Sequence, residues 1–144
     1  MSMQRNFLIF LIFILMSMPT FAEEELVVVV NGNNPIEQMT RSEVIDLFMG
    51  KYVAFPDGNK AIAVDLTSEH KTKKIFYQRL VGRSLASINA YWSRIRFTGR
   101  AKPPIKKESK EGVVQYVATT KNAISYIPKS MLNEKLKVVY QLNE

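Results

Sequence analysis

Residues 61–82 read AIAVDLTSEHKTKKIFYQRLVG, a short apolar run that leads directly into a segment with helical spacing. The run at residues 61–65 has the length and composition of a buried strand. Ile75, Phe76 and Leu80 then recur at the spacing of one helix face, and Gly82 is typical of a helix C-terminus. The stretch therefore predicts a strand followed by a helix, the repeating unit of an α/β domain.

The same alternation continues upstream of this unit. Residues 25–30 (ELVVVV) form a continuous apolar run, which is typical of a strand buried on both faces in a parallel sheet. Residues 40–43 (TRSE) then match the capping-box pattern of a helix N-terminus, and Gly50 is expected to end that helix.

Downstream, Ser84 is expected to cap a helix that ends near Gly99. Trp92 lies on the apolar face of that helix, so we expect it in the core rather than on a ligand. Residues 100–110 contain two prolines and five cations and are predicted to be a loop. A helix after Ser109 and strands at 123–127 and 136–142 complete the pattern. We therefore predict an α/β domain with a mostly parallel sheet covered by helices.

The N-terminus has the pattern of a secretory signal peptide over residues 1–22. Arg5 precedes an apolar run at residues 7–16, and residues 20–22 (TFA) supply the small residues of a cleavage site. The alternative is an uncleaved N-terminal anchor. We expect a periplasmic protein whose residues 23–144 form one domain. Because the chain has no cysteine, this domain is expected to fold by packing alone.

The composition limits the classes of function. The net charge of +7 favours anionic partners, although it also serves solubility. Because the signal peptide predicts export, we predict no nucleic-acid ligand. One histidine and no cysteine do not form a usual zinc site, and no catalytic motif or cofactor cradle is present. We therefore predict a binding protein, not an enzyme, with no metal and no cofactor.

Four stretches, in this order, resemble the phosphate-type periplasmic substrate-binding proteins of ABC transporters. The resemblance is greatest to their small single-domain members. The stretches are residues 40–51 (TRSEVIDLFMGK), 61–80, 91–99 (YWSRIRFTG) and 122–127 (NAISYI). The resemblance implies a single lobe of the type 2 periplasmic-binding-protein fold. It also implies a small oxyanion such as phosphate as ligand, and a membrane transporter or another envelope protein as partner.

The resemblance also marks where this chain departs from the family. The large phosphate binders carry Arg and then Asp-Gly-Ser-Gly-Thr at the strand-to-helix junction. Thr72 is the one residue type kept here. Asp65 stands in place of the Arg, His70 in place of the Ser, and Glu69 and Lys71 in place of the glycines. A carboxylate repels an oxyanion, and side chains hinder close approach of the backbone. The alternative function is therefore an envelope interaction module that keeps the fold and has lost solute binding.

Seven residues are our candidate ligand-binding residues: Thr67, Ser68, His70, Thr72, Arg94, Arg96 and Arg100. The first four lie at a helix N-terminus, which attracts anions, and the arginines can form a basic rim. The alternatives are helix capping by the hydroxyls, a solvated histidine and a solvated basic face.

A single lobe exposes half a site, so tight binding is expected to need a second copy of the chain or another protein. A third hypothesis is that residues 100–110 bind anionic lipid or another polyanion, with affinity that falls as salt rises.

Overall fold

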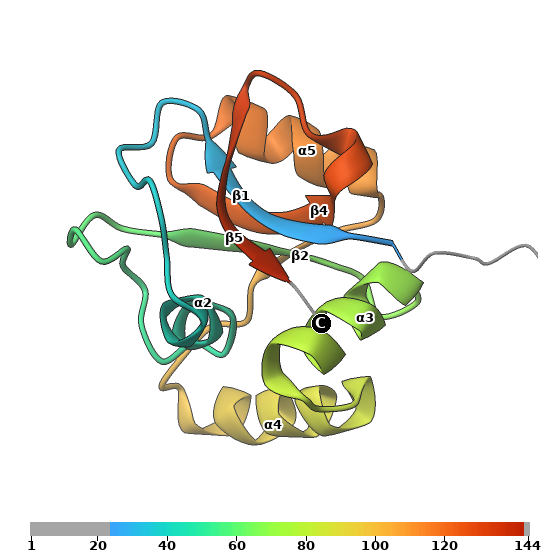
Figure 1. The fold of residues 1–144 in the computed structure, drawn as a ribbon. Coiled ribbons are helices and arrows are strands. Elements are labelled where there is room, and N and C mark those ends of the chain that lie inside the picture. Colours follow the sequence, from blue (N-terminus) through green and yellow to red (C-terminus); the bar gives the residue numbers. More distant parts are fainter. Residues whose placement is uncertain (1–23, 143–144) are drawn as a thin grey trace, which may run out of the picture.

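The computed structural model describes residues 24–142, so the predicted signal peptide lies outside the described residues. The elements are β1 (Leu26–Asn31), α2 (Arg41–Phe48), β2 (Ile62–Leu66), α3 (Lys71–Val81), α4 (Leu85–Thr98), β3 (Ile105–Lys107), α5 (Lys110–Thr119), β4 (Ala123–Pro128), a 3-10 helix (Lys129–Met131) and β5 (Leu136–Leu142). The five strands form one sheet in the order β3-β2-β4-β1-β5 (Figure 1).

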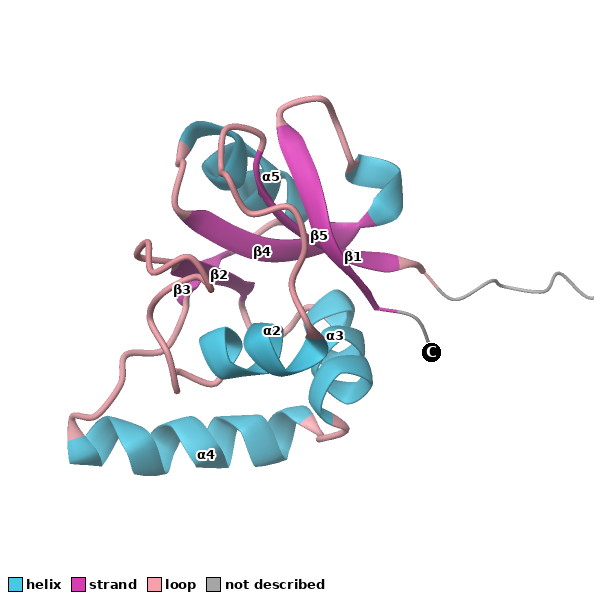
Figure 2. Cartoon of the chain, turned by 60° about the vertical axis from the view of Figure 1, so that its left-hand side comes forward, coloured by secondary structure: helices cyan, strands magenta, loops and turns pink. Residues whose placement is uncertain are grey.

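The sheet lies between two layers of helices. Helix α5 covers one face, whereas α2 and α3 cover the other face and α4 packs outside them (Figures 1 and 2). This double cover explains why every residue of β1 and β4 is buried. The predicted α/β class is thus confirmed, with apolar strands enclosed by helices.

The strand directions differ from the expected mostly parallel sheet. Strand β2 pairs in parallel with β3 and β4, but β1 runs antiparallel to both β4 and β5. The sheet is therefore mixed. The apolar run at residues 25–30 predicted burial correctly, but burial on two faces does not determine the direction of the neighbouring strands.

The N-termini of α2, α4 and α5 lie where the local patterns predict them, whereas α3 begins at Lys71, later than the predicted start at Thr67 and Ser68. The Thr40 Oγ1 accepts a hydrogen bond from the Glu43 backbone N–H at 3.2 Å, and Glu43 Oε2 accepts one from the Thr40 N–H at 2.8 Å. Ser84 and Ser109 cap α4 and α5. Trp92 is only 8% exposed, so its predicted place in the core is confirmed.

The predicted loop at residues 100–110 contains an element that the prediction missed. Ile105–Lys107 form the edge strand β3, which pairs in parallel with the carboxyl-terminal half of β2. The strand is short and exposed and has two lysines, so it has no apolar alternation to reveal it. Its position brings the end of the basic loop to the end of β2.

Gly50 allows a close approach between the end of α2 and helix α4. Its φ is +73°, and a Cβ there would lie 2.6 Å from the Trp92 side chain. We expect Gly50→Ala to lower the free energy of unfolding by about 1–2 kcal/mol because of the left-handed conformation. Overpacking against Trp92 should lower it by roughly 1–3 kcal/mol more. Gly99→Ala is the control, because φ is +66° there and nothing lies within 4 Å. Urea unfolding measures both, and equal losses would contradict the packing argument.

Candidate functional site

A cleft of about 260 Å³ opens at the carboxyl end of β2, between the start of α3, helix α4 and the chain entering β3. In α/β sheets, ligands bind beyond the carboxyl ends of strands. The cleft is lined by Asp65, Ser68, Lys73, Ile88, Asn89, Trp92, Ser93, Arg96, Pro103, Pro104 and Lys106. It therefore combines an apolar wall with cations and hydroxyls.

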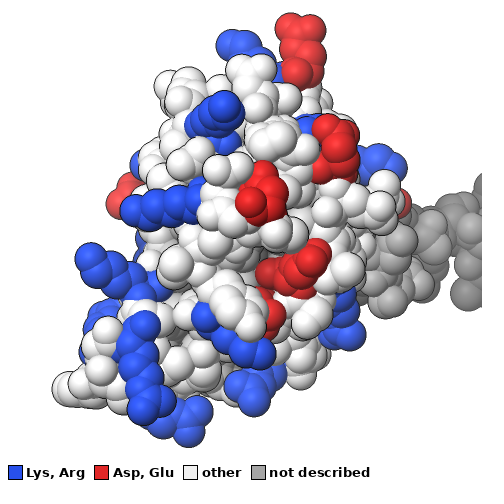
Figure 3. Space-filling view, turned by 90° about the vertical axis from the view of Figure 1, so that its left-hand side faces the viewer, with Lys and Arg blue, Asp and Glu red and all other residues white. Residues whose placement is uncertain are grey.

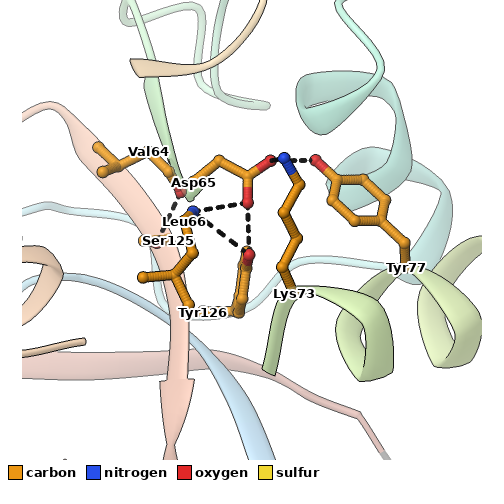
Figure 4. Close-up of polar contacts among 7 residues, drawn as sticks. All are labelled: Val64, Asp65, Leu66, Lys73, Tyr77, Ser125 and Tyr126. Carbon is orange, nitrogen blue, oxygen red and sulfur yellow. Dashed lines mark hydrogen bonds and ion pairs between the residues drawn. The ribbon is translucent and has the colours of Figure 1, made fainter. Parts of the chain in front are cut away.

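The carboxylate of Asp65 lines this cleft but is only 3% exposed. Its Oδ1 accepts hydrogen bonds from the Leu66 backbone N–H at 2.7 Å and from the Tyr126 hydroxyl. Its Oδ2 accepts one from the Tyr77 hydroxyl at 2.6 Å. Figure 4 shows these donors converging on the two oxygens from the end of β2, from β4 and from α3. The carboxylate is thus bound on both oxygens by the protein itself.

Lys73 supplies the opposite charge. Its Nζ lies 3.6 Å from Asp65 Oδ2, and its residue is 3% exposed. The same ammonium lies 5.9 Å from the centre of the Tyr77 ring, within the range of a cation–π contact. The pair leaves no net charge at the inner end of the cleft. Sequence reasoning missed Lys73, because it belongs to a run of lysines with the composition of a solvated helix start.

The two tyrosines are held by the core as well as by Asp65. The Tyr126 ring stacks on Phe76 at a centroid distance of 3.7 Å, and Phe76 makes an edge contact with Phe48. Burial, with the added charge of Asp65, raises the pKa of both Tyr77 and Tyr126 above the usual range. Both phenols therefore remain protonated donors.

The seven predicted residues do not gather at one place. Ser68 and Arg96 line the cleft, whereas Thr67, His70, Thr72, Arg94 and Arg100 are not among its lining residues. Thr72 is buried, and its Oγ1 lies 3.4 Å from Glu24 Oε2. The His70 Nε2 contacts the carbonyl oxygen of Glu108. Arg94 and Arg100 are exposed.

Neither Thr67 nor Ser68 caps α3. His70 occupies the N-cap position, and its side chain makes no capping hydrogen bond. The Thr67 backbone N–H donates to the Lys107 carbonyl at 3.1 Å, which ties the junction to β3. The pKa of Glu69 is lowered because its carboxylate accepts hydrogen bonds from the Glu69 backbone N–H and from the Thr67 side chain. The first turn of α3 is thus left without a side-chain cap.

The cleft carries a net positive charge. Arg96 and Lys106 line it, and neither side chain makes a hydrogen bond or an ion pair with any residue in the range 24–142. Because Asp65 is already paired with Lys73, these two charges are not cancelled within the cleft. The arrangement suits a small anion better than a cation. Within the same range, no three acidic or histidine side chains are placed to hold a metal, and no helix is long and apolar enough to span a membrane.

No protein-family model matches the chain, and no curated protein matches it. Several solved structures, however, are similar to it. A phosphate ABC transporter substrate-binding protein from Clostridium perfringens with bound phosphate superposes with a TM-score of 0.65 at 16% identity, over 81% of this chain. An ABC-type phosphate transport receptor from Vibrio cholerae gives 0.64 at 16% identity, over 81% of this chain. PstS from Borrelia burgdorferi gives 0.62 at 12% identity, again over 81%.

The chain has the fold of the phosphate ABC transporter substrate-binding proteins. It spans 44%, 45% and 47% of the lengths of those three proteins. The neighbours are named as transport proteins and not as enzymes. Identities of 12–16% establish the fold alone.

The buried pair predicts a non-additive double-mutant cycle. Asp65→Asn leaves the Lys73 ammonium buried without a counter-charge, so we expect a loss of about 3–5 kcal/mol in the free energy of unfolding. Lys73→Met should cost less, because three hydrogen bonds still hold the carboxylate. The double variant should lose less than the sum of the two. The partly exposed pair of Lys51 and Asp46, at 3.8 Å, is the control, and its coupling energy should be below about 1 kcal/mol. Strict additivity at Asp65 and Lys73 would contradict the pairing.

The tyrosines predict a loss of stability at alkaline pH. Tyrosine side chains in the unfolded chain ionise near pH 10, whereas Tyr77 and Tyr126 keep their protons in the folded state. Above about pH 10 the unfolded state therefore binds fewer protons than the folded state, and stability falls as pH rises. Tyr77→Phe should make this fall shallower in urea unfolding series. Tyr52→Phe, at an exposed ring outside the network, is the control. An unchanged slope in Tyr77→Phe would show that other groups cause the fall.

Proposed function

We propose that residues 23–144 form a periplasmic solute-binding-protein-like domain that binds a small oxyanion such as phosphate in the cleft at the end of β2. The proposal rests on two cationic side chains, Arg96 and Lys106, which line the cleft and have no acidic partner among the described residues. The carboxylate at the inner end of the cleft, Asp65, is already neutralised by Lys73. A guanidinium binds two oxygens of one oxyanion, and the ammonium adds a second charge.

Asp65 does not oppose this binding as strongly as its position suggests. Its oxygens are occupied by Leu66, Tyr126 and Tyr77, and the Lys73 ammonium balances its charge. An oxyanion in the cleft therefore faces a neutral ion pair, which repels it less than a free carboxylate would. In this proposal the ligand lies further out than the junction, between Ser68 and helix α4.

Two features of the junction add to the attraction for anions. The Ser68 hydroxyl lines the cleft, and no side chain caps the first turn of α3. The first backbone N–H groups of a helix carry a partial positive charge and accept an anion as partner. Glu69 works against this attraction, because it is an exposed carboxylate beside the same turn.

The proposed ligand is bound and released without chemistry, as in transport. A cleft on a single lobe remains open to water, so we expect weak affinity from the domain alone. Closure by a second copy, by an ABC transporter subunit or by another envelope protein would exclude water and raise the affinity. Export by the predicted signal peptide would place the domain where such partners meet the solute.

Thermal unfolding of residues 23–144 at fixed ionic strength tests the proposal, with phosphate and sulfate titrated separately. A ligand of the folded state stabilises it by about 2.7 kcal/mol at a hundredfold excess over Kd. We expect a saturable rise in Tm for one anion, reduced in Ser68→Ala and lost in Arg96→Gln. Arg83→Gln removes an exposed charge outside the cleft and is the matched control.

Two results would contradict the proposal. The first is the absence of any saturable, anion-selective shift. The second is an equal shift in Arg96→Gln and Arg83→Gln, which would show that the anion acts through the overall charge. Either result would favour the interaction module.

A further inference from the structure

The charges of this chain are segregated along the sequence. Eleven of the 20 lysines and arginines lie between Glu69 and Glu108, and none of the 13 acidic residues does. The rest of the chain carries nine basic and 13 acidic residues. A positive net charge that serves solubility alone needs no such separation, so this arrangement calls for a partner.

The basic segment forms one end of the folded molecule. It comprises α3, α4 and the chain into β3, and α4 is the outermost layer at that end (Figure 2). Figure 3 shows a group of lysine and arginine side chains without acidic neighbours at the lower end of one face, whereas higher on that face basic and acidic side chains are mixed. The fold therefore turns the charge segregation of the sequence into a polarised surface.

Helix α4 presents an uncharged outer face with one aromatic residue at its end. Ile88 and Trp92 are buried on the inner side. At about 100° per residue, Phe97 lies about 180° from Ile88. Its side chain is 93% exposed, which is extreme for a phenylalanine. The exposed residues nearest to it on this face, Ala86 and Ala90, are small.

Three cationic side chains near this aromatic residue in the sequence have no partner in the described part of the protein. The side chains of Arg94, Arg100 and Lys102 are exposed and make no hydrogen bond or ion pair with any residue in the range 24–142. They therefore do not serve the fold. Arg94 lies three residues before Phe97 and therefore one turn away on α4, whereas Arg100 and Lys102 lie on the chain just after the helix ends.

We propose that the outer face of α4 docks on an anionic lipid surface. Phe97 enters the boundary between headgroups and acyl chains, and Arg94, Arg100 and Lys102 contact lipid phosphates. The small side chains let the helix approach the surface closely. An acidic protein would satisfy the cations, but a lipid surface also accounts for the exposed aromatic ring. This inference is independent of the proposed oxyanion site, because none of these residues lines the cleft.

Vesicle sedimentation tests the inference with the chain from residue 23 onward, which holds the whole sheet and core and lacks the apolar run at residues 7–16. Vesicles of phosphatidylcholine alone are compared with vesicles that also contain phosphatidylglycerol. We expect binding only to the second kind, weakening as salt rises. Arg94→Gln and Arg100→Gln should each lower the partition coefficient roughly fivefold. Phe97→Ser should lower it as well and leave the salt dependence unchanged.

The matched controls lie away from the basic end. Leu132→Ser removes another exposed apolar side chain, and Lys121→Gln and Lys135→Gln remove exposed charges. These three variants should bind the vesicles as the unaltered chain does. The inference is overturned if the unaltered chain does not bind anionic vesicles at low salt, or if the control variants lose as much binding as the α4 variants. It is also overturned if Phe97→Ser keeps full binding while the arginine variants lose it, because the surface would then be a general polyanion site.

Discussion

The buried carboxylate of Asp65 is the constraint on which the arrangement around the cleft depends. Charge can be buried only where enough donors meet it, and here they come from the end of β2, from β4 and from α3. Tyr77 and Lys73 lie on consecutive turns of α3, so the contact orients the whole helix against the sheet. The rotation of α3 in turn determines which side chains its first turn presents to the cleft.

This constraint also moves the place where an anion can be bound. In the phosphate-type proteins that the sequence resembles, the strand-to-helix junction itself is expected to hold the oxyanion. Here the junction holds a carboxylate of the protein and the lysine that neutralises it. Positive charge without a partner is found on α4 and at β3 instead, at Arg96 and Lys106. The fold is thus retained, whereas the positive charge without a partner lies on other elements.

What the sequence predicts well is local. The capping box at Thr40 and the apolar spacing that buries Trp92 each depend on residues within one or two turns. What it misses is long-range. The direction of β1 depends on strands about 100 residues away, and β3 exists because a lysine-containing segment meets the edge of β2. Lys73 resembles a surface lysine until Asp65 and Tyr77 are placed beside it. A cleft does open at the junction where the candidate site was predicted, but only Ser68 and Arg96 of the seven predicted residues line it.

Helix α4 can serve two surfaces because neighbouring residues on a helix point in different directions. Arg96 lines the cleft, and Phe97, about 100° further around the axis, faces solvent. The basic segment between Glu69 and Glu108 places Arg96 and Phe97 in one positive electrostatic field. This field raises the local concentration of any anion, dissolved or membrane-bound. Screening by salt therefore weakens both attractions together. What distinguishes them is contact chemistry, because a small oxyanion gains nothing from an exposed phenylalanine, whereas a lipid boundary does.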